Sequence, residues 1–219
     1  MSETKPRSSA SATNSAMYQL KLSLSGTPAW RRLLVREDMN IGLLHAVIQV
    51  AMGWTNSHLH LFFINNKLYT DPSTSDNMDI DGPPELDEGK STLKEVAPRE
   101  KTKFTYEYDF GDSWEHKVTV EKIHAPDGKR KHFAECIDGR GGCPPEDCGG
   151  VGGYAELLDI MKEPGHSEYE SMKEWLGDRF DPEKLDIDHV NAHLRMLKWP
   201  RTSELGLAKV LMARDGFIE

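Results

Sequence analysis

Histidines and carboxylates that could do chemistry gather in two short stretches of the sequence. The first holds His58 and His60, and the second holds Asp109, Asp112 and His116. In an extended strand, residues two apart share a face, so His58 would align with His60, and Asp112 with His116. Imidazole and carboxylate groups bind divalent metals and act as general acids and bases near neutral pH. We predict that these five side chains line one cleft; the alternative is that the aspartates cap a turn and the histidines are satisfied at strand ends.

Three cysteines offer a second candidate site. Their odd and small number argues against a disulfide framework and favours a reducing compartment. Cys143 and Cys148, with a histidine from elsewhere, could hold a structural divalent metal such as zinc. The alternative is a set of buried free thiols in a Gly-rich turn.

The elements that must position these residues begin with strands. Alternation of apolar and polar residues predicts a strand over 18–24, and 30–35 is expected to be its hairpin partner. Asn40 is a suitable N-cap for a helix whose apolar residues repeat at helical spacing from Ile41 until Gly53 ends it.

The two chemical stretches fall on further strands. Residues 58–64 are strand-like, and an Asn65-Asn66 turn leads into 67–69. Asp, Glu, Pro, Gly and Ser dominate 71–90, so we expect a mobile acidic loop there. Strands over 104–108 and 114–123 would form a hairpin around the turn at 109–113.

The rest of the chain is expected to be mainly helical. A short strand at 133–136 precedes a Gly-rich run over 139–153, which lacks a P-loop lysine and is best explained as a sharp entry to a helix. Helices are predicted in four segments, which are 154–163, 167–176, 188–197 and 203–213. Strands and one helix followed by a block of helices indicate the α+β class, with a mixed sheet whose opening order is also that of a β-grasp sheet.

Length and composition limit the domain organisation. The chain has 219 residues, 37% of them hydrophobic, and single cores serve roughly 100 to 200 residues. Residues 1–16 have almost no large apolar side chain, so we expect a disordered tail. We expect one α+β domain over 17–200 and a C-terminal helical extension over 201–219.

Charge and hydropathy exclude some partners. The net charge of −9 does not support nucleic acid as a partner, because the bulk of the protein repels phosphate. No apolar run approaches the roughly 18 to 20 residues that cross a bilayer, and the N-terminus has no signal-peptide core. We therefore expect a cytoplasmic protein without a membrane partner.

Three separated motifs carry a resemblance to a known family. They are Trp54–His60, Tyr108–His116 and Cys143–Gly150, and together they resemble the plasmid pRiA ORF-three-like family over about Met17 to Trp199. The resemblance implies an α+β fold and no established activity. Some relatives are labelled passenger TnpR-like or resolvase, but a serine resolvase needs a nucleophilic serine among clustered arginines and a basic DNA-binding segment, which this sequence lacks.

The sequence therefore favours an uncharacterised binding or interaction module for a small molecule or protein. One alternative is a metal-dependent hydrolase or nuclease that uses His58, His60, Asp112 and His116. Another is a nucleic-acid accessory protein of a mobile element, which rests only on associations of the family. Whether the protein is an enzyme is left open.

Overall fold

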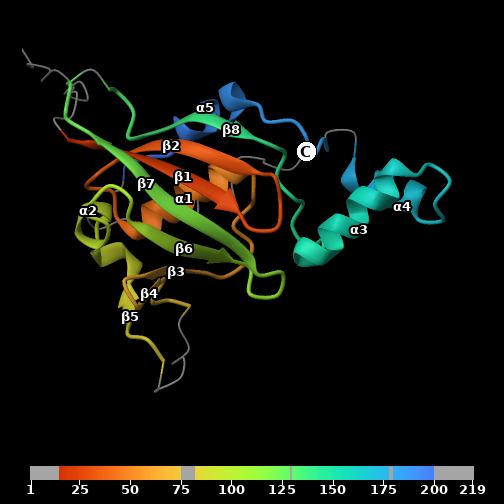
Figure 1. The fold of residues 1–219 in the computed structure, drawn as a ribbon, viewed down its shortest axis with the longest axis horizontal. Coiled ribbons are helices and arrows are strands. Elements are labelled where there is room, and N and C mark those ends of the chain that lie inside the picture. The colour runs from red at the N-terminus through yellow and green to blue at the C-terminus, as the bar shows by residue number, and fades with distance from the viewer. Residues whose placement is uncertain (1–14, 75–81, 129, 178–179, 200–219) are drawn as a thin grey trace, which may run out of the picture.

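The computed structural model of the protein describes residues 15–74, 82–128, 130–177 and 180–199 (Figure 1). Within these residues, eight strands form one sheet in the order β5-β4-β3-β6-β7-β1-β2-β8. The strands are β1 (Met17–Leu24), β2 (Trp30–Arg36), β3 (His60–Ile64), β4 (Lys67–Thr70), β5 (Glu85–Asp87), β6 (Lys103–Tyr108), β7 (Trp114–His124) and β8 (Ala134–Arg140). Strand β4 pairs parallel with β5, whereas the other pairings are antiparallel. The sheet is therefore mixed, as predicted.

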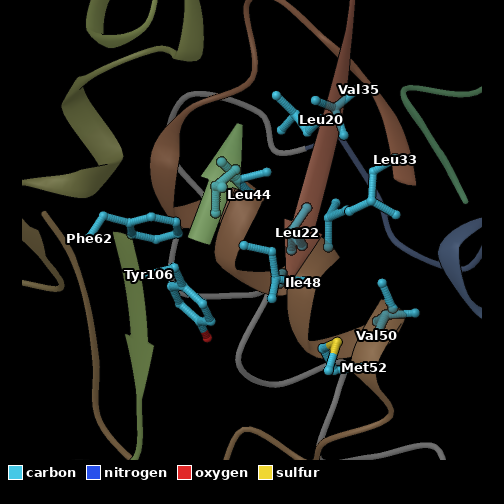
Figure 2. Close-up of a cluster of buried hydrophobic side chains, with 14 of the residues drawn as sticks. Leu20, Leu22, Leu33, Val35, Leu44, Ile48, Val50, Met52, Phe62 and Tyr106 are labelled. Carbon is cyan, nitrogen blue, oxygen red and sulfur yellow. The ribbon is translucent and has the colours of Figure 1, made fainter. Parts of the chain in front are cut away.

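Helix α1 (Ile41–Met52) packs against one face of the sheet and forms the core with it. Every residue of α1 except Gly42 is buried. Figure 2 shows Leu44 and Ile48 of the helix among side chains of the sheet such as Leu22 and Tyr106. Burial alternates along β1, since Leu20 and Leu22 are fully buried while Gln19, Lys21 and Ser23 are partly exposed. The 2-residue period of the strand thus selects the face that meets α1.

The predicted ends of α1 are confirmed. The Asn40 side chain accepts a hydrogen bond from the Leu43 amide at 2.7 Å. Gly53 ends the helix at φ 93°, a left-handed conformation that glycine adopts without a Cβ clash. The hairpin turns are also confirmed, since β1 pairs with β2, β3 with β4 and β6 with β7.

The expected acidic loop over 71–90 contains ordered structure in its second part. Strand β5 and the 3₁₀ helix η1 (Glu88–Lys90) lie there, followed by the unpredicted helix α2 (Leu93–Val96). Glu88 is buried, and its carboxylate lies 2.8 Å from His60 Nε2. The segment has a polar composition without the alternation of a strand. It is ordered by the contact of Glu88 with His60, which is far away in the sequence, and by the pairing of β5 with β4. Residues 75–81 lie outside the described residues.

Three helices follow the sheet, as the sequence predicts. They are α3 (Gly150–Lys162), α4 (Tyr169–Leu176) and α5 (Ile187–Leu194). Helix α3 begins inside the Gly-rich run, before the expected start at Tyr154. Helix α5 packs against β8, where the Asn191 side chain bonds both the amide and the carbonyl of Cys136 at 2.8 Å.

Two terminal predictions fall mainly on parts that the structure does not describe. The predicted helix at 203–213 and the predicted extension over 201–219 lie outside the described residues, as do residues 1–14 of the expected tail. Ala16, at the end of that tail, is buried, and its backbone bonds Glu37. Among the described helices, none has the length and apolar content needed to cross a membrane.

Candidate functional site

Three potential metal ligands, His58, Asp109 and Asp147, meet beside one end of β3 and β6. His58 Nε2 lies 3.6 Å from Asp109 Oδ2 and 3.1 Å from Asp147 Oδ1. One ligand atom from each residue lies within 4.8 Å of the other two. We call this group the His58 site. In the described part of the chain, it is the only group of three or more histidine, cysteine, aspartate or glutamate side chains gathered so closely.

His58 is positioned by the backbone just before β3. The Tyr108 hydroxyl accepts hydrogen bonds from the Ser57 amide at 3.0 Å and the His58 amide at 3.3 Å. The Tyr108 ring also contacts the imidazole edge-on, with 5.8 Å between ring centroids. His58 Nε2 is buried, yet it has no hydrogen-bond partner among the described residues. The contacts of His58 Nε2 with Asp109 and Asp147 are therefore within ion-pair distance, but neither has the geometry of a hydrogen bond.

Asp109 is fixed by the turn between β6 and β7. Its amide donates to the Leu59 carbonyl at 2.8 Å, which holds the end of β6 against the approach to β3. Its Oδ1 atom accepts from the Gly111 amide at 2.9 Å and, more weakly, from the Asp112 amide at 3.4 Å. Because the turn uses Oδ1, the other oxygen, Oδ2, is directed at His58. Asp109 has φ 59°, a backbone conformation that is uncommon outside glycine and often found at functional sites.

Asp147 comes from the loop 143–149, which neighbouring residues hold in place. Glu146 accepts short hydrogen bonds from the hydroxyls of Tyr108 and Thr55, and a third from the Thr55 amide at 3.1 Å. Trp54 Nε1 donates to the Pro144 carbonyl at 3.0 Å. Burial, together with the Glu146 carboxylate, raises the pKa of Tyr108, so this hydroxyl keeps its proton and donates.

His60 lies near the site but is directed elsewhere. Its Nε2 atom lies 2.8 Å from a Glu88 carboxylate oxygen, and its ring stacks on His45 with 3.4 Å between centroids. His58 and His60 nevertheless share the lining of one cavity of 240 Å³. The cavity is also lined by Thr55, Asn56, Ser57, Leu59 and Thr74.

Asp112 and His116 do not join His58 in the predicted cleft. The Asp112 carboxylate accepts from the Gly149 amide at 3.2 Å and so links the turn to the loop 143–149. His116 is fully buried in the core, with Nδ1 3.0 Å from the Trp114 carbonyl. Burial lowers its pKa to about 4, so the imidazole is neutral near pH 7. The structure thus brings together two of the five predicted residues, His58 and Asp109, and adds Asp147.

The predicted cysteine site has no third ligand close by. Cys143 and Cys148 are free thiols, and neither belongs to a close group of three potential ligands among the described residues. Burial raises the pKa of Cys143 well above its usual value and that of Cys148 to about 11. Both thiols are therefore protonated near pH 7 in the metal-free protein.

The geometry of the His58 site fits a small divalent cation. Donors bound tetrahedrally at about 2.1 Å lie about 3.4 Å apart, close to the 3.1 and 3.6 Å observed. The buried Asp109 marks the inner side of the site, and the Asp147 side chain, 73% exposed, marks the outer side. A cation here would have three protein donors and further coordination positions facing solvent.

Comparison with known proteins identifies relatives without an assigned activity. The family model of the plasmid pRiA4b ORF-3-like protein matches residues 16–189, which include all three motifs. The uncharacterized protein y4hQ of Sinorhizobium fredii is 33% identical over 192 residues, covering 85% of this chain and 95% of that protein. The crystal structure of MM3350, a protein of unknown function from Methanosarcina mazei Go1, is 36% identical with a TM-score of 0.69. That match covers 80% of this chain and 98% of the other.

Proposed function

The chain belongs to the plasmid pRiA4b ORF-3-like family, and from its three motifs we propose that it is a divalent-cation-binding module. The observation that supports this proposal best is the meeting of His58, Asp109 and Asp147. Each of these residues comes from a different motif, and the motifs are separated by many residues along the chain. A ligand held by all three would explain why such distant segments place ionisable groups side by side.

Electrostatics favour a cation at this position. Asp109 is only 7% exposed, and its carboxylate has a second carboxylate, that of Asp147, as a neighbour. Taking a charged group out of water is costly unless an opposite charge compensates it. A divalent ion between the two carboxylates and the imidazole would supply that charge.

The donor types indicate which cation is expected. Calcium and magnesium prefer sites made entirely of oxygen, whereas an imidazole with carboxylates suits zinc or manganese. Three protein donors leave positions for a small molecule or for a side chain of a protein partner. We propose that the module binds such a ligand through the metal. Three free thiols fit the proposed reducing, cytoplasmic compartment.

A metal-dependent hydrolase is the second candidate. It is favoured by the exposed outer side of the His58 site, since catalytic zinc sites combine three protein ligands with an open position for water. Zinc-dependent cleavage of bis(p-nitrophenyl) phosphate by the wild-type protein, lost in Asp147→Asn, would support the hydrolase. Stoichiometric zinc binding without turnover would support the binding module.

The binding experiment is a zinc titration of protein first stripped with EDTA. We expect one equivalent of zinc on the wild-type protein by calorimetry and elemental analysis. Asp147→Asn should weaken binding at least tenfold, because it removes one of three donors from an exposed residue whose loss need not unfold the chain. A manganese titration should show the same ranking of variants.

Two matched controls identify the site. Asp112→Asn changes a nearby carboxylate that is not a proposed ligand. Asparagine keeps an oxygen that can accept from the Gly149 amide and so hold the loop, and the zinc affinity should therefore equal that of the wild type. Cys148→Ser should also keep its zinc. Loss of zinc in Cys148→Ser with retention in Asp147→Asn would reject the His58 site in favour of a cysteine site.

A further inference from the structure

The face of the sheet opposite α1 carries a row of aligned side chains that the His58 site does not use. Register places five residues of five adjacent strands side by side, from β3 through β6, β7 and β1 to β2. This row consists of Phe63, Thr105, Lys117, Ser23 and Trp30. An aromatic ring therefore stands at each end of the row, with a lysine and two hydroxyls between them.

A second row beside the first contains most of the positive charge. Register aligns Lys103 of β6, Thr119 of β7, Lys21 of β1 and Arg32 of β2. Arg32 is neutralised by ion pairs with Glu121 and Asp138. Lys103 and Lys117, in contrast, take part in none of the ion pairs formed between described residues. We call these two rows the aromatic–lysine face.

This face is open to solvent where the aromatic ring and the lysines meet. Phe63 is 39% exposed although its neighbours in the strand, Phe62 and Ile64, are fully buried. Lys103 and Lys117 are exposed. All three line a cavity of 350 Å³ whose other residues are Asn65, Phe104, Thr105, Val118 and Thr119. No carboxylate is among the described residues that line it. Glu107 and Glu115 lie on the same face, two residues further along β6 and β7, and each accepts a hydrogen bond from a serine hydroxyl. In Figure 1, α1 lies behind the sheet and this face is turned towards the viewer.

We propose that the aromatic–lysine face binds single-stranded nucleic acid. A base would stack on the exposed Phe63 ring, while phosphates would meet Lys103, Lys117 and Lys21, with threonine hydroxyls as hydrogen-bonding partners. Exposed aromatic rings on a sheet beside basic residues are the usual platform for unpaired bases. Four strand spacings of about 4.8 Å separate Phe63 from Trp30, which gives about 19 Å. That span suits a strand of a few nucleotides.

The ring and the charges together favour a nucleic acid over an acidic peptide. Lysines alone would attract either polymer, but a base can also stack on the exposed Phe63 ring, whereas the side chains of aspartate and glutamate have no ring to stack. Trp30, the aromatic residue at the other end of the row, already has two cations over its ring. The charged groups of Lys21 and Arg32 are each 5.0 Å from the Trp30 ring centroid. The overall charge of −9 keeps long-range attraction weak, so binding is expected at low salt and depends on this local face.

Fluorescence anisotropy with a labelled 12-nucleotide single strand of mixed sequence, in EDTA at low salt, tests the proposal. EDTA removes any metal from the His58 site, so this result does not depend on the proposed function. We expect binding with an association constant whose logarithm falls as the logarithm of the salt concentration rises. The slope should be about −2, the value for three phosphate contacts with a single strand. Phe63→Ala should weaken it about 5- to 150-fold, the range for loss of one stacked base. Lys103→Glu combined with Lys117→Glu should abolish it.

Matched variants separate this face from general charge effects. Phe110→Ala removes an aromatic ring of similar exposure, 41%, from the turn between β6 and β7, and Lys94→Glu with Lys173→Glu makes the same change in net charge elsewhere. Both should bind like the wild type. Absence of binding at 50 mM salt would overturn the proposal. Equal weakening by the two lysine pairs, or equal displacement by polyglutamate with no effect of Phe63→Ala, would overturn it as well.

Discussion

At the scale of single residues, Asp109 shows how one side chain can serve the fold and the site together. Its Oδ1 atom stabilises the turn by accepting hydrogen bonds from two backbone amides, and its Oδ2 atom faces His58. Asp109 has a positive φ of 59°, and its side chain is largely buried. Turn geometry and ligand geometry are therefore set by the same few backbone angles.

His116 supplies a prediction about pH, because its pKa lies near 4 when folded and near 6.5 when unfolded. Between these values the unfolded chain binds more protons, so the free energy of unfolding should fall as pH decreases from 6.5 to 4. Above pH 6.5 both states are neutral and the effect is absent. The loss over this window is about 3 kcal/mol for such a shift.

Urea unfolding across this pH range, with His116→Asn as the comparison, measures that contribution. Asparagine keeps a donor near the Trp114 carbonyl but does not titrate, so the variant should lose about 3 kcal/mol less over the same window. Parallel curves for the two proteins would show that folding does not change the pKa of His116 and would contradict the prediction.

The sequence predicts only part of the candidate site, because the rule that residues two apart share a face applies only inside strands. His58 and His60 were expected to share a face, but β3 begins at His60 and His58 lies in the irregular segment before it. Asp112 likewise precedes β7, whereas Trp114 and His116 do share a face, which is the core. Asp147 was overlooked although it lies in the third motif. The acidic pair Glu146-Asp147, between Cys143 and Cys148, was the signal in the sequence that could have indicated it.

At the scale of elements, the start of α3 controls the loop that carries Asp147. A Cβ atom on Gly153 would lie 1.9 Å from the Cys148 carbonyl oxygen, whereas a Cβ on Gly152 would meet nothing within 4 Å. Gly153→Ala should therefore push the loop 143–149 away from His58, lower the free energy of unfolding by about 1 to 3 kcal/mol, and weaken zinc binding. Chemical denaturation and zinc calorimetry measure the two effects.

Gly152→Ala is the control one residue away. It should keep full zinc affinity and raise stability by up to about 1 kcal/mol, because alanine is a better helix former than glycine. Equal zinc binding by the two variants would show that contact between α3 and the loop does not position Asp147.

The elements that the sequence predicted are those with local signals. Both α1 and the hairpins have regular apolar periods, caps or turn residues within a few positions of one another. Strand β5 has no such period and forms through its parallel pairing with β4 and through the contact of Glu88 with His60. The early start of α3 was hidden because glycines disfavour helices in isolation, and packing against the loop 143–149 overrides that preference.

At the scale of the whole molecule, the His58 site joins segments that are distant along the chain. One potential ligand comes from each of three segments, which are the approach to β3, the turn between β6 and β7, and the loop before α3. The aromatic–lysine face lies on the side of the sheet opposite α1 and shares no residue with this site. We therefore expect the proposed cation binding and the proposed nucleic-acid binding to be separable by substitution.

A cation that links three segments of the folded state and is absent from the unfolded state must stabilise the whole molecule. At a free zinc concentration 100 times its dissociation constant, the gain is about 2.7 kcal/mol. For a chain of this size that corresponds to a rise in melting temperature of about 5 to 11 °C. Differential scanning calorimetry in zinc and in EDTA measures the rise, which a tenfold or greater loss of affinity should cut to about half or less in Asp147→Asn and which should persist in Asp112→Asn. If Asp147→Asn retained the full rise, the stabilising ion would be bound elsewhere, because a site that has lost one of three donors cannot give the same affinity.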